Sequence, residues 1–147
     1  MLQRSYWLNV QEDVASAVER AKSEASKLPR LETVLAIAFL RRATVPLWGD
    51  ILGSVRGAFP DAEVCGATVD MSVIDGVQWL SEELGEDSDV LGSLTFMFFE
   101  RSSVRAMVLP DDPVAAGATL RQALDEDADA RAVGLLISDM RVDFKPL

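Results

Sequence analysis

The sequence predicts an α/β domain with a single central mixed sheet and about three helices packed on it. Apolar runs of strand length alternate with segments whose apolar residues recur at helical spacing, which is typical of α/β folds. Two stretches, 33–68 and 104–138, each have the strand, helix, strand pattern of a βαβ unit. The chain has 147 residues, is 49% apolar and contains six prolines, so we expect one globular domain over 1–147. A mixed α+β arrangement is the alternative.

The first βαβ unit is the best defined part of the sequence. Val34–Leu40 is a continuous apolar run, as expected for a strand buried on both faces. Pro46 suits the first position of a helix, where its missing N–H costs no hydrogen bond. Apolar residues at helical spacing follow, and Pro60 ends that helix. Glu63–Ala67 is then predicted to be a second strand, parallel to the first.

Before this unit we expect a strand and a surface helix. Leu2–Leu8 is the predicted strand. Asn9 is the expected N-cap of the helix, because Glu12 stands three residues later in a capping-box arrangement. The apolar face of the helix extends from Val10 to Leu28, and Pro29 ends it.

The segment Val69–Leu91 permits two interpretations. Val73–Val77 continues an extended path with a turn signal at Asp75-Gly76, whereas Val77–Leu84 has the pattern of two helical turns. The densest acidic run of the chain follows, and a solvated loop is its simplest interpretation because no metal-ligand spacing is present. The acidic residues of the run are Glu82, Glu83, Glu86, Asp87 and Asp89.

The second unit begins with a predicted antiparallel hairpin. Leu94–Phe99 and Val104–Leu109 are apolar runs separated by a short polar segment. Asp112-Pro113 then has the N-cap and first-position residues of a helix. We expect this helix to end between Leu124 and Asp127, where acidic residues meet the negative end of the helix dipole. Ala132–Ile137 is predicted to be the last buried strand.

Composition excludes several classes of function. A net charge of −10 and a pI near 4.4 disfavour nucleic acid and anionic membranes as partners. The chain has no histidine, which excludes Ser-His-Asp and Cys-His catalysis. Its single cysteine, Cys65, cannot form an internal disulfide and is expected to be a buried structural residue. With no signal-peptide pattern and no apolar stretch near the roughly 20 residues that span a bilayer, we expect a soluble cytoplasmic protein without cofactor or metal.

The order of the elements resembles the N-terminal FIST domain, a sensory module of signalling proteins. The most specific segment is FPDAEVCGAT at 59–68, followed by LPDDPVAAGATLRQAL at 109–124. The resemblance covers Ala15–Asp139 and implies ligand sensing, with Gly66, Ala67 and Thr68 matching the small-residue loop of the family. It transfers no catalytic residue. The chain is shorter than family domains, and it lacks the histidine through which some members are reported to hold haem.

Ligands of open α/β sheets usually bind beyond the carboxyl ends of parallel strands. Three loops lie there if the predicted strands are parallel, and their hydroxyl, carboxylate and guanidinium groups suit an amino-acid-like or carboxylate ligand, which arginine can clamp with two hydrogen bonds. Solvated edge residues are the alternative interpretation. The candidate residues are Arg41, Arg42, Thr44, Thr68, Asp70, Ser72, Ser138, Asp139 and Arg141, together with Gly66 and Ala67.

The predicted function is therefore a non-enzymatic sensory module that binds a small polar molecule and signals through a protein partner. A structural or interaction domain without ligand, assembling as a homodimer or larger homo-oligomer through an open sheet edge, is the second interpretation. An enzyme using Cys65, or Mg²⁺ held by Asp111-Asp112 or by Asp70 and Asp75, is the weakest, since Asp112 is more simply a helix cap.

Overall fold

The chain forms two compact units, Met1–Ala106 and Met107–Leu147. The structure, a computed structural model, describes residues 1–9, 13–69, 71–74, 77–80, 89–127, 130 and 133–134. The prediction of a single domain over 1–147 stays a prediction.

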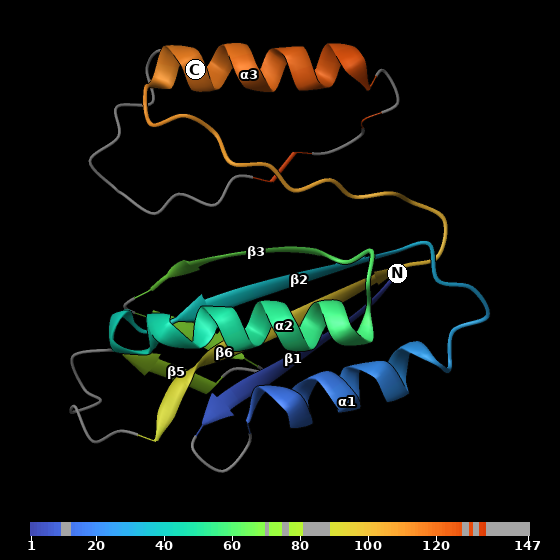
Figure 1. Cartoon of the computed structure of the whole chain (residues 1–147), viewed down its shortest axis with the longest axis vertical. Coiled ribbons are helices and arrows are strands. Elements are labelled where there is room, and N and C mark those ends of the chain that lie inside the picture. Colours follow the sequence, from blue (N-terminus) through green and yellow to red (C-terminus); the bar gives the residue numbers. More distant parts are fainter. Residues whose placement is uncertain are drawn as a thin grey trace. The chain divides into compact units, whose positions relative to one another are not determined.

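The first unit is built on a mixed four-stranded sheet with the strand order β1-β6-β2-β3. Its strands are β1 (Leu2–Asn9), β2 (Thr33–Leu40), β3 (Glu63–Thr68) and β6 (Val90–Phe99). β6 is antiparallel to both of its neighbours, and β2 is parallel to β3. It follows that β1, β2 and β3 all run in one direction, with β6 reversed between them (Figure 1).

Two α-helices cover one face of this sheet, as Figure 1 shows. They are α1 (Val14–Ala25) and α2 (Trp48–Ala58), and α2 is preceded by the 3₁₀ helix η1 (Arg42–Leu47). Side chains alternate between the two faces along a strand, so every second residue of β1, β2 and β6 faces the helices. The core of the unit lies between these layers. Its buried strand residues are Tyr6, Leu8, Val34, Ala36, Ala38, Leu40, Leu94, Phe96 and Phe98.

The opposite face of the sheet, here called the outer face, is largely apolar and mostly half-buried, although Ser93 of β6 is buried on it. It carries the intervening residues Leu35, Ile37, Phe39, Thr95 and Met97. On this face the hydroxyl oxygens of Ser5 and Thr95 lie 2.9 Å apart. The α/β class and the central mixed sheet predicted from the sequence are therefore confirmed, as is the βαβ unit at 33–68.

The N-terminal helix begins later than predicted. Asn9 is the last residue of β1, and the N-cap of α1 is Asp13, whose Oδ1 accepts a 2.8 Å hydrogen bond from the backbone N–H of Ser16. The predicted capping partner, Glu12, lies outside the described residues. The capping-box prediction was wrong because Asn9 continues the pairing of β1 with β6, opposite Val90.

Two further helix predictions need correction. Pro46 lies inside η1 and not at the first position of α2, which begins two residues later at Trp48. Val77–Leu80 belongs to the segment for which two helical turns were one of two interpretations, and it is strand β5, which pairs antiparallel with β4 (Met71–Ile74). The extended interpretation was therefore the correct one for the described part of this segment, and β4 contacts β1. Of the acidic run, only Asp89 lies in the described residues.

The predicted hairpin of Leu94–Phe99 with Val104–Leu109 was wrong in its second half. Leu94–Phe99 is the last part of β6, but Val104–Leu109 forms no strand. Because β6 pairs with β1 on one side and β2 on the other, neither of its edges is free for the following segment. The backbone N–H of Ala106 instead donates to Oε2 of Glu63, in β3, at 3.3 Å.

The second unit contains helix α3 (Pro113–Glu126), with the predicted N-cap. Oδ1 of Asp112 accepts a 2.8 Å hydrogen bond from the N–H of Ala115. Val133 and Gly134 are not in a strand, and the rest of Ala132–Ile137 lies outside the described residues, so the βαβ unit at 104–138 is not formed as predicted.

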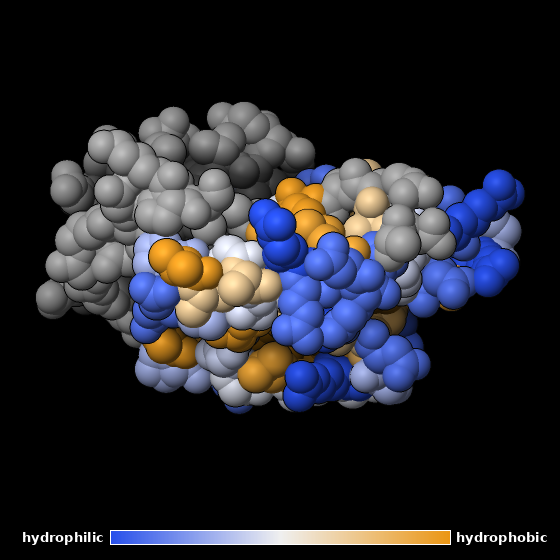
Figure 2. All heavy atoms as spheres, turned by 90° about the horizontal axis from the view of Figure 1, so that it is seen from above, coloured by the Kyte–Doolittle hydropathy of each residue, from blue (hydrophilic) through white to orange (hydrophobic). Residues whose placement is uncertain are grey.

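On the face seen in Figure 2, hydrophobic residues form small patches among hydrophilic ones. In the described ranges, no helix has the length and apolar character to cross a membrane.

Candidate functional site

The carboxyl ends of three strands meet at one edge of the sheet. Leu40, the last residue of β2, pairs with Thr68, the last residue of β3, and the backbone N–H of Val69 donates to the Leu40 carbonyl at 2.9 Å. β1 runs in the same direction and ends at Asn9. Because each helix follows its strand, α1 and the η1–α2 segment both begin at this edge, which is where α/β proteins commonly bind ligands.

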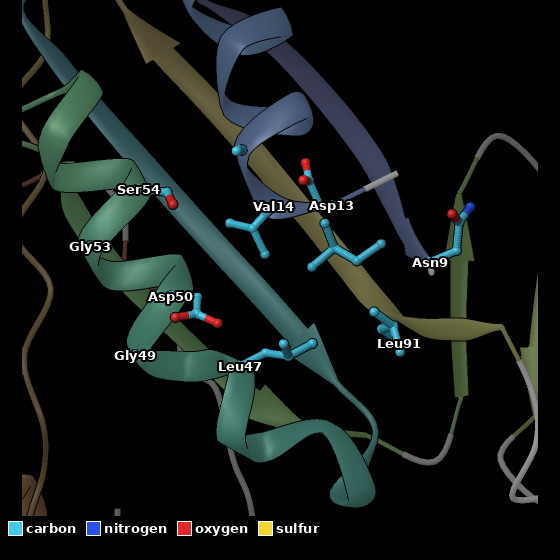
Figure 3. Close-up of a pocket in the computed structure, with 11 residues that line it drawn as sticks. Asn9, Asp13, Val14, Leu47, Gly49, Asp50, Gly53, Ser54 and Leu91 are labelled. Carbon is cyan, nitrogen blue, oxygen red and sulfur yellow. The ribbon is translucent and has the colours of Figure 1, made fainter. Parts of the chain in front are cut away.

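A groove of about 580 Å³ opens between the starts of α1 and α2. Figure 3 shows Asp50 and Ser54 projecting from α2 toward the side occupied by Val14, with Leu47 and Leu91 further along the groove. Its apolar lining is Leu8, Val14, Ala15, Leu47 and Leu91. Its polar lining is Asn9, Asp13, Asp50 and Ser54, and the backbone of Gly49 and Gly53 completes the α2 side.

The fixed charge of the groove is negative. The hydrogen bond from the backbone N–H of Ser16 holds the pKa of Asp13 below its usual value, so this carboxylate is ionised at neutral pH. Asp50 is exposed in the first turn of α2. None of the described residues that line the groove is basic. An ammonium group is therefore better matched to the rim than a carboxylate, while the apolar floor suits a hydrocarbon body.

Arg41 lies at the predicted edge, but its side chain is turned into the protein. It is only 7% exposed, and Nη1 donates to the carbonyl of Val90 at 3.1 Å. Its backbone N–H donates to the carbonyl of Leu91 at 3.3 Å. In this arrangement the guanidinium supports the start of β6. The predicted clamp on a ligand carboxylate is not the arrangement that the structure contains.

Thr44 and Arg42 lie in η1, directly after β2. The hydroxyl of Thr44 lies 2.6 Å from the carbonyl oxygen of Leu91 and 2.9 Å from that of Arg41. Thr44 therefore binds backbone groups at this edge and does not line the groove.

Gly66 and Ala67 belong to β3 itself and not to a loop, which corrects the prediction of a small-residue loop at this position. Gly66 pairs with Ala38, and a Cβ at Gly66 would stand 2.1 Å from the Ala38 carbonyl oxygen, so only glycine fits. Thr68 is exposed at the end of β3, at the same edge as Arg41. Ser72 lies in β4, and Asp70, Ser138, Asp139 and Arg141 lie outside the described residues.

Cys65 is a half-buried residue of β3 with no sign of activation. Burial, and then the negative charge of Glu63, raise the pKa of the Cys65 thiol, so it stays protonated near neutral pH. Within the described ranges, no group of three or more carboxylate or thiol side chains is placed to hold a metal ion.

The groove residues were not predicted from the sequence. Asp50 and Ser54 are four residues apart on α2, beside its buried residues Ile51 and Val55, and this spacing is the one signal that pointed to a shared polar face. Nothing in the sequence pointed to Leu91, because its position depends on how β6 pairs with β1.

No family model, no curated protein and no solved structure matches this chain. The resemblance to FIST domains therefore stays a prediction.

Proposed function

We propose that this chain is a non-enzymatic module that binds a small polar ligand in the groove and passes the bound state to a signalling protein. The observation that carries the proposal is the place of the groove. It lies at the carboxyl ends of β1 and β2, between the starts of two helices, and combines an apolar floor with a polar rim. Small-molecule sites in α/β proteins have this location and this mixture of surfaces.

The ligand that fits best carries an ammonium group on a short apolar body, and amino acids belong to this class. Asp13 and Asp50 stand at the rim and attract a cation, while Leu47 and Leu91 offer contact to the body. Simple carboxylates are disfavoured, because the rim charge repels them and the guanidinium of Arg41 is engaged with the Val90 carbonyl.

Thermal-shift measurements with matched compounds test this proposal. Amino acids and aliphatic amines should raise the melting temperature, and the corresponding simple carboxylates should not, because ligands that bind the folded state stabilise it. Replacing Asp50 by Asn should weaken binding roughly tenfold, the effect of losing one charged hydrogen-bond partner.

Asp61→Asn is the matched control for this variant. It makes the same charge change just beyond the opposite end of α2, where Asp61 is exposed, and it should leave binding unchanged. Equal weakening by the two variants would mean that only the net charge matters. A complete absence of stabilisation by amines and amino acids would remove the proposal.

A second function, self-association without ligand, is favoured by one observation. β3 is an edge strand of the four-stranded sheet, and edge strands present unpaired backbone groups to another chain. Light scattering over a range of protein concentrations tests this function. A molar mass that doubles as the protein concentration rises, and that does not change when amino acids are added, favours self-association. A mass that stays at the monomer value contradicts it.

A further inference from the structure

Leu91 is the extra residue of a β-bulge at the edge of the groove. The pairing of β1 with β6 passes from Leu8 opposite Gly92 directly to Asn9 opposite Val90, so Leu91 has no partner of its own in β1. Bulges re-aim a side chain relative to the regular strand and are common beside functional sites. Here the re-aimed side chain lines the groove (Figure 3).

The residue after the bulge allows β6 to approach the end of β2 closely. A Cβ at Gly92 would stand 2.4 Å from the carbonyl oxygen of Phe39 and 2.9 Å from Cδ2 of Leu40. Any larger residue would push β6 away from β2 at this point. The position of the bulge is therefore tied to the end of β2, whose next residue is Arg41.

Three hydrogen bonds then fasten the bulge from that side. The N–H of Arg41 and the hydroxyl of Thr44 both donate to the carbonyl of Leu91, at 3.3 and 2.6 Å, and the guanidinium of Arg41 donates to the carbonyl of Val90 at 3.1 Å. We call Arg41 and Thr44 the latch. Both of its side chains are at least partly buried, where such bonds meet little competition from water.

We propose that Leu91 is the specificity-determining residue of the groove, and that Arg41 and Thr44 are positioning residues that act through it. This inference rests on the proposed function for its ligand, but the latch itself is a property of the folded protein. The size of residue 91 sets how large an apolar body the groove admits. The latch holds Leu91 in one position, because its hydrogen bonds fix the backbone carbonyls of Val90 and of Leu91 itself. The space beside the Leu91 side chain therefore stays constant.

A thiol reporter measures the size limit without any ligand. Ser54→Cys, in a Cys65→Ser background, places a thiol on the α2 side of the groove. The readout is the ratio of its modification rates by benzyl and methyl methanethiosulfonate. Leu91→Ala should raise this ratio roughly tenfold, the scale of one or two methylenes in an apolar site. Thr44→Val, which removes the hydroxyl and keeps the shape, should raise it in the same direction.

Two control variants separate the latch from general destabilisation. Thr44→Ser keeps the hydroxyl and should leave the ratio at the unmodified reporter's value. Leu35→Ala truncates a leucine on the outer face, away from the groove, and should also leave it unchanged. Thermal melts of each variant check folding. If Leu91→Ala is unfolded, Leu91→Val takes its place and should raise the ratio by a smaller factor, whereas Leu91→Met keeps the side-chain volume and should leave the ratio unchanged.

Each result decides a part of the inference. An unchanged ratio in Leu91→Ala, or a changed ratio in Leu91→Met, overturns the specificity role. An unchanged ratio in Thr44→Val, or equal changes in Thr44→Ser and Thr44→Val, overturns the positioning role. Failure of amino acids to stabilise the protein would remove the proposed function and leave these rate ratios intact, so the two failures are distinguishable.

Discussion

The two faces of the four-stranded sheet are made by alternate residues of the same strands, yet they differ in burial. On the helix-covered face, Phe96 and Phe98 are fully buried and stack with ring centroids 6.1 Å apart, and the Phe59 ring lies within 6.0 Å of both. On the outer face, Met97 stands between them in sequence and is only half-buried. The difference teaches that the stability of this unit comes chiefly from one face.

The largest effect is expected for a substitution in the buried, helix-covered face. Phe96→Ala should lower the free energy of unfolding by about 3–5 kcal/mol, because it removes a fully buried ring and leaves a cavity between the sheet and its helices. Met97→Ala, one residue away on the outer face, should cost clearly less. Chemical denaturation of both variants measures the contrast, and equal losses would contradict the difference between the faces.

A second test replaces two glycines by alanine and expects stability changes of opposite sign. Gly66→Ala should destabilise the protein by roughly 1–3 kcal/mol or more, since the new methyl would meet the Ala38 carbonyl within β3's pairing with β2. Gly57→Ala, in α2, meets nothing within 4 Å and should stabilise by about 0.5–1 kcal/mol through helix propensity. Urea midpoints report both signs, and destabilisation by Gly57→Ala would mean that a contact covers that position.

A smaller effect is expected at the latch. Thr44→Val should cost about 1 kcal/mol, the net value of a typical hydrogen bond, because the Leu91 carbonyl loses the shorter of its two donors. Thr119→Val is the matched control. The Thr119 hydroxyl also donates to a backbone carbonyl, that of Ala115, but on an exposed helix where water replaces it. Equal costs in thermal unfolding would argue against a special role for the buried bond.

The smallest effect concerns acid stability at the start of α1. The folded-state pKa of Asp13 lies below its ordinary value of 3.8, so its carboxylate stabilises the protein above that pH, and the contribution is lost as the pH falls through the folded pKa. Asp13→Asn keeps an N-cap oxygen and removes this titration. The stability advantage of the natural protein over the variant should therefore shrink below about pH 4. Melting curves of both proteins between pH 7 and 3 measure this difference in stability. A difference that stays constant over this range would show that Asp13 does not contribute to the acid dependence of stability.

Local patterns were sufficient to predict the elements whose stability is decided within a few residues. The βαβ unit at 33–68 follows from an apolar run, a helical stripe and Pro60, and the start of α3 follows from Asp112-Pro113. The position of β6 between β1 and β2 was not predictable in this way, because it depends on pairing between distant residues. The error at Val104–Leu109 follows from that, since a hairpin requires a free edge on β6.

The candidate site shows the same division. Arg41 and Thr44 lie beyond the carboxyl end of β2, as predicted, and β3 ends beside it because the two strands are parallel. The partners of these two residues are the carbonyls of Val90 and Leu91, which arrive there only when β6 inserts into the sheet. The chemistry of arginine therefore predicted a carboxylate clamp, while the fold gives it a structural role.

The central place of β6 also decides when this unit can fold during synthesis. Leu2 pairs with Phe98 and Thr33 with Phe99. Strands β1 and β2 are therefore synthesised well before β6, the strand that pairs with both of them. Until the ribosome has released that segment, β1 and β2 have no shared neighbour, and their apolar sides stay open to solvent or to chaperones. The sheet of this unit can therefore be completed only late in synthesis, after β6 has left the ribosome.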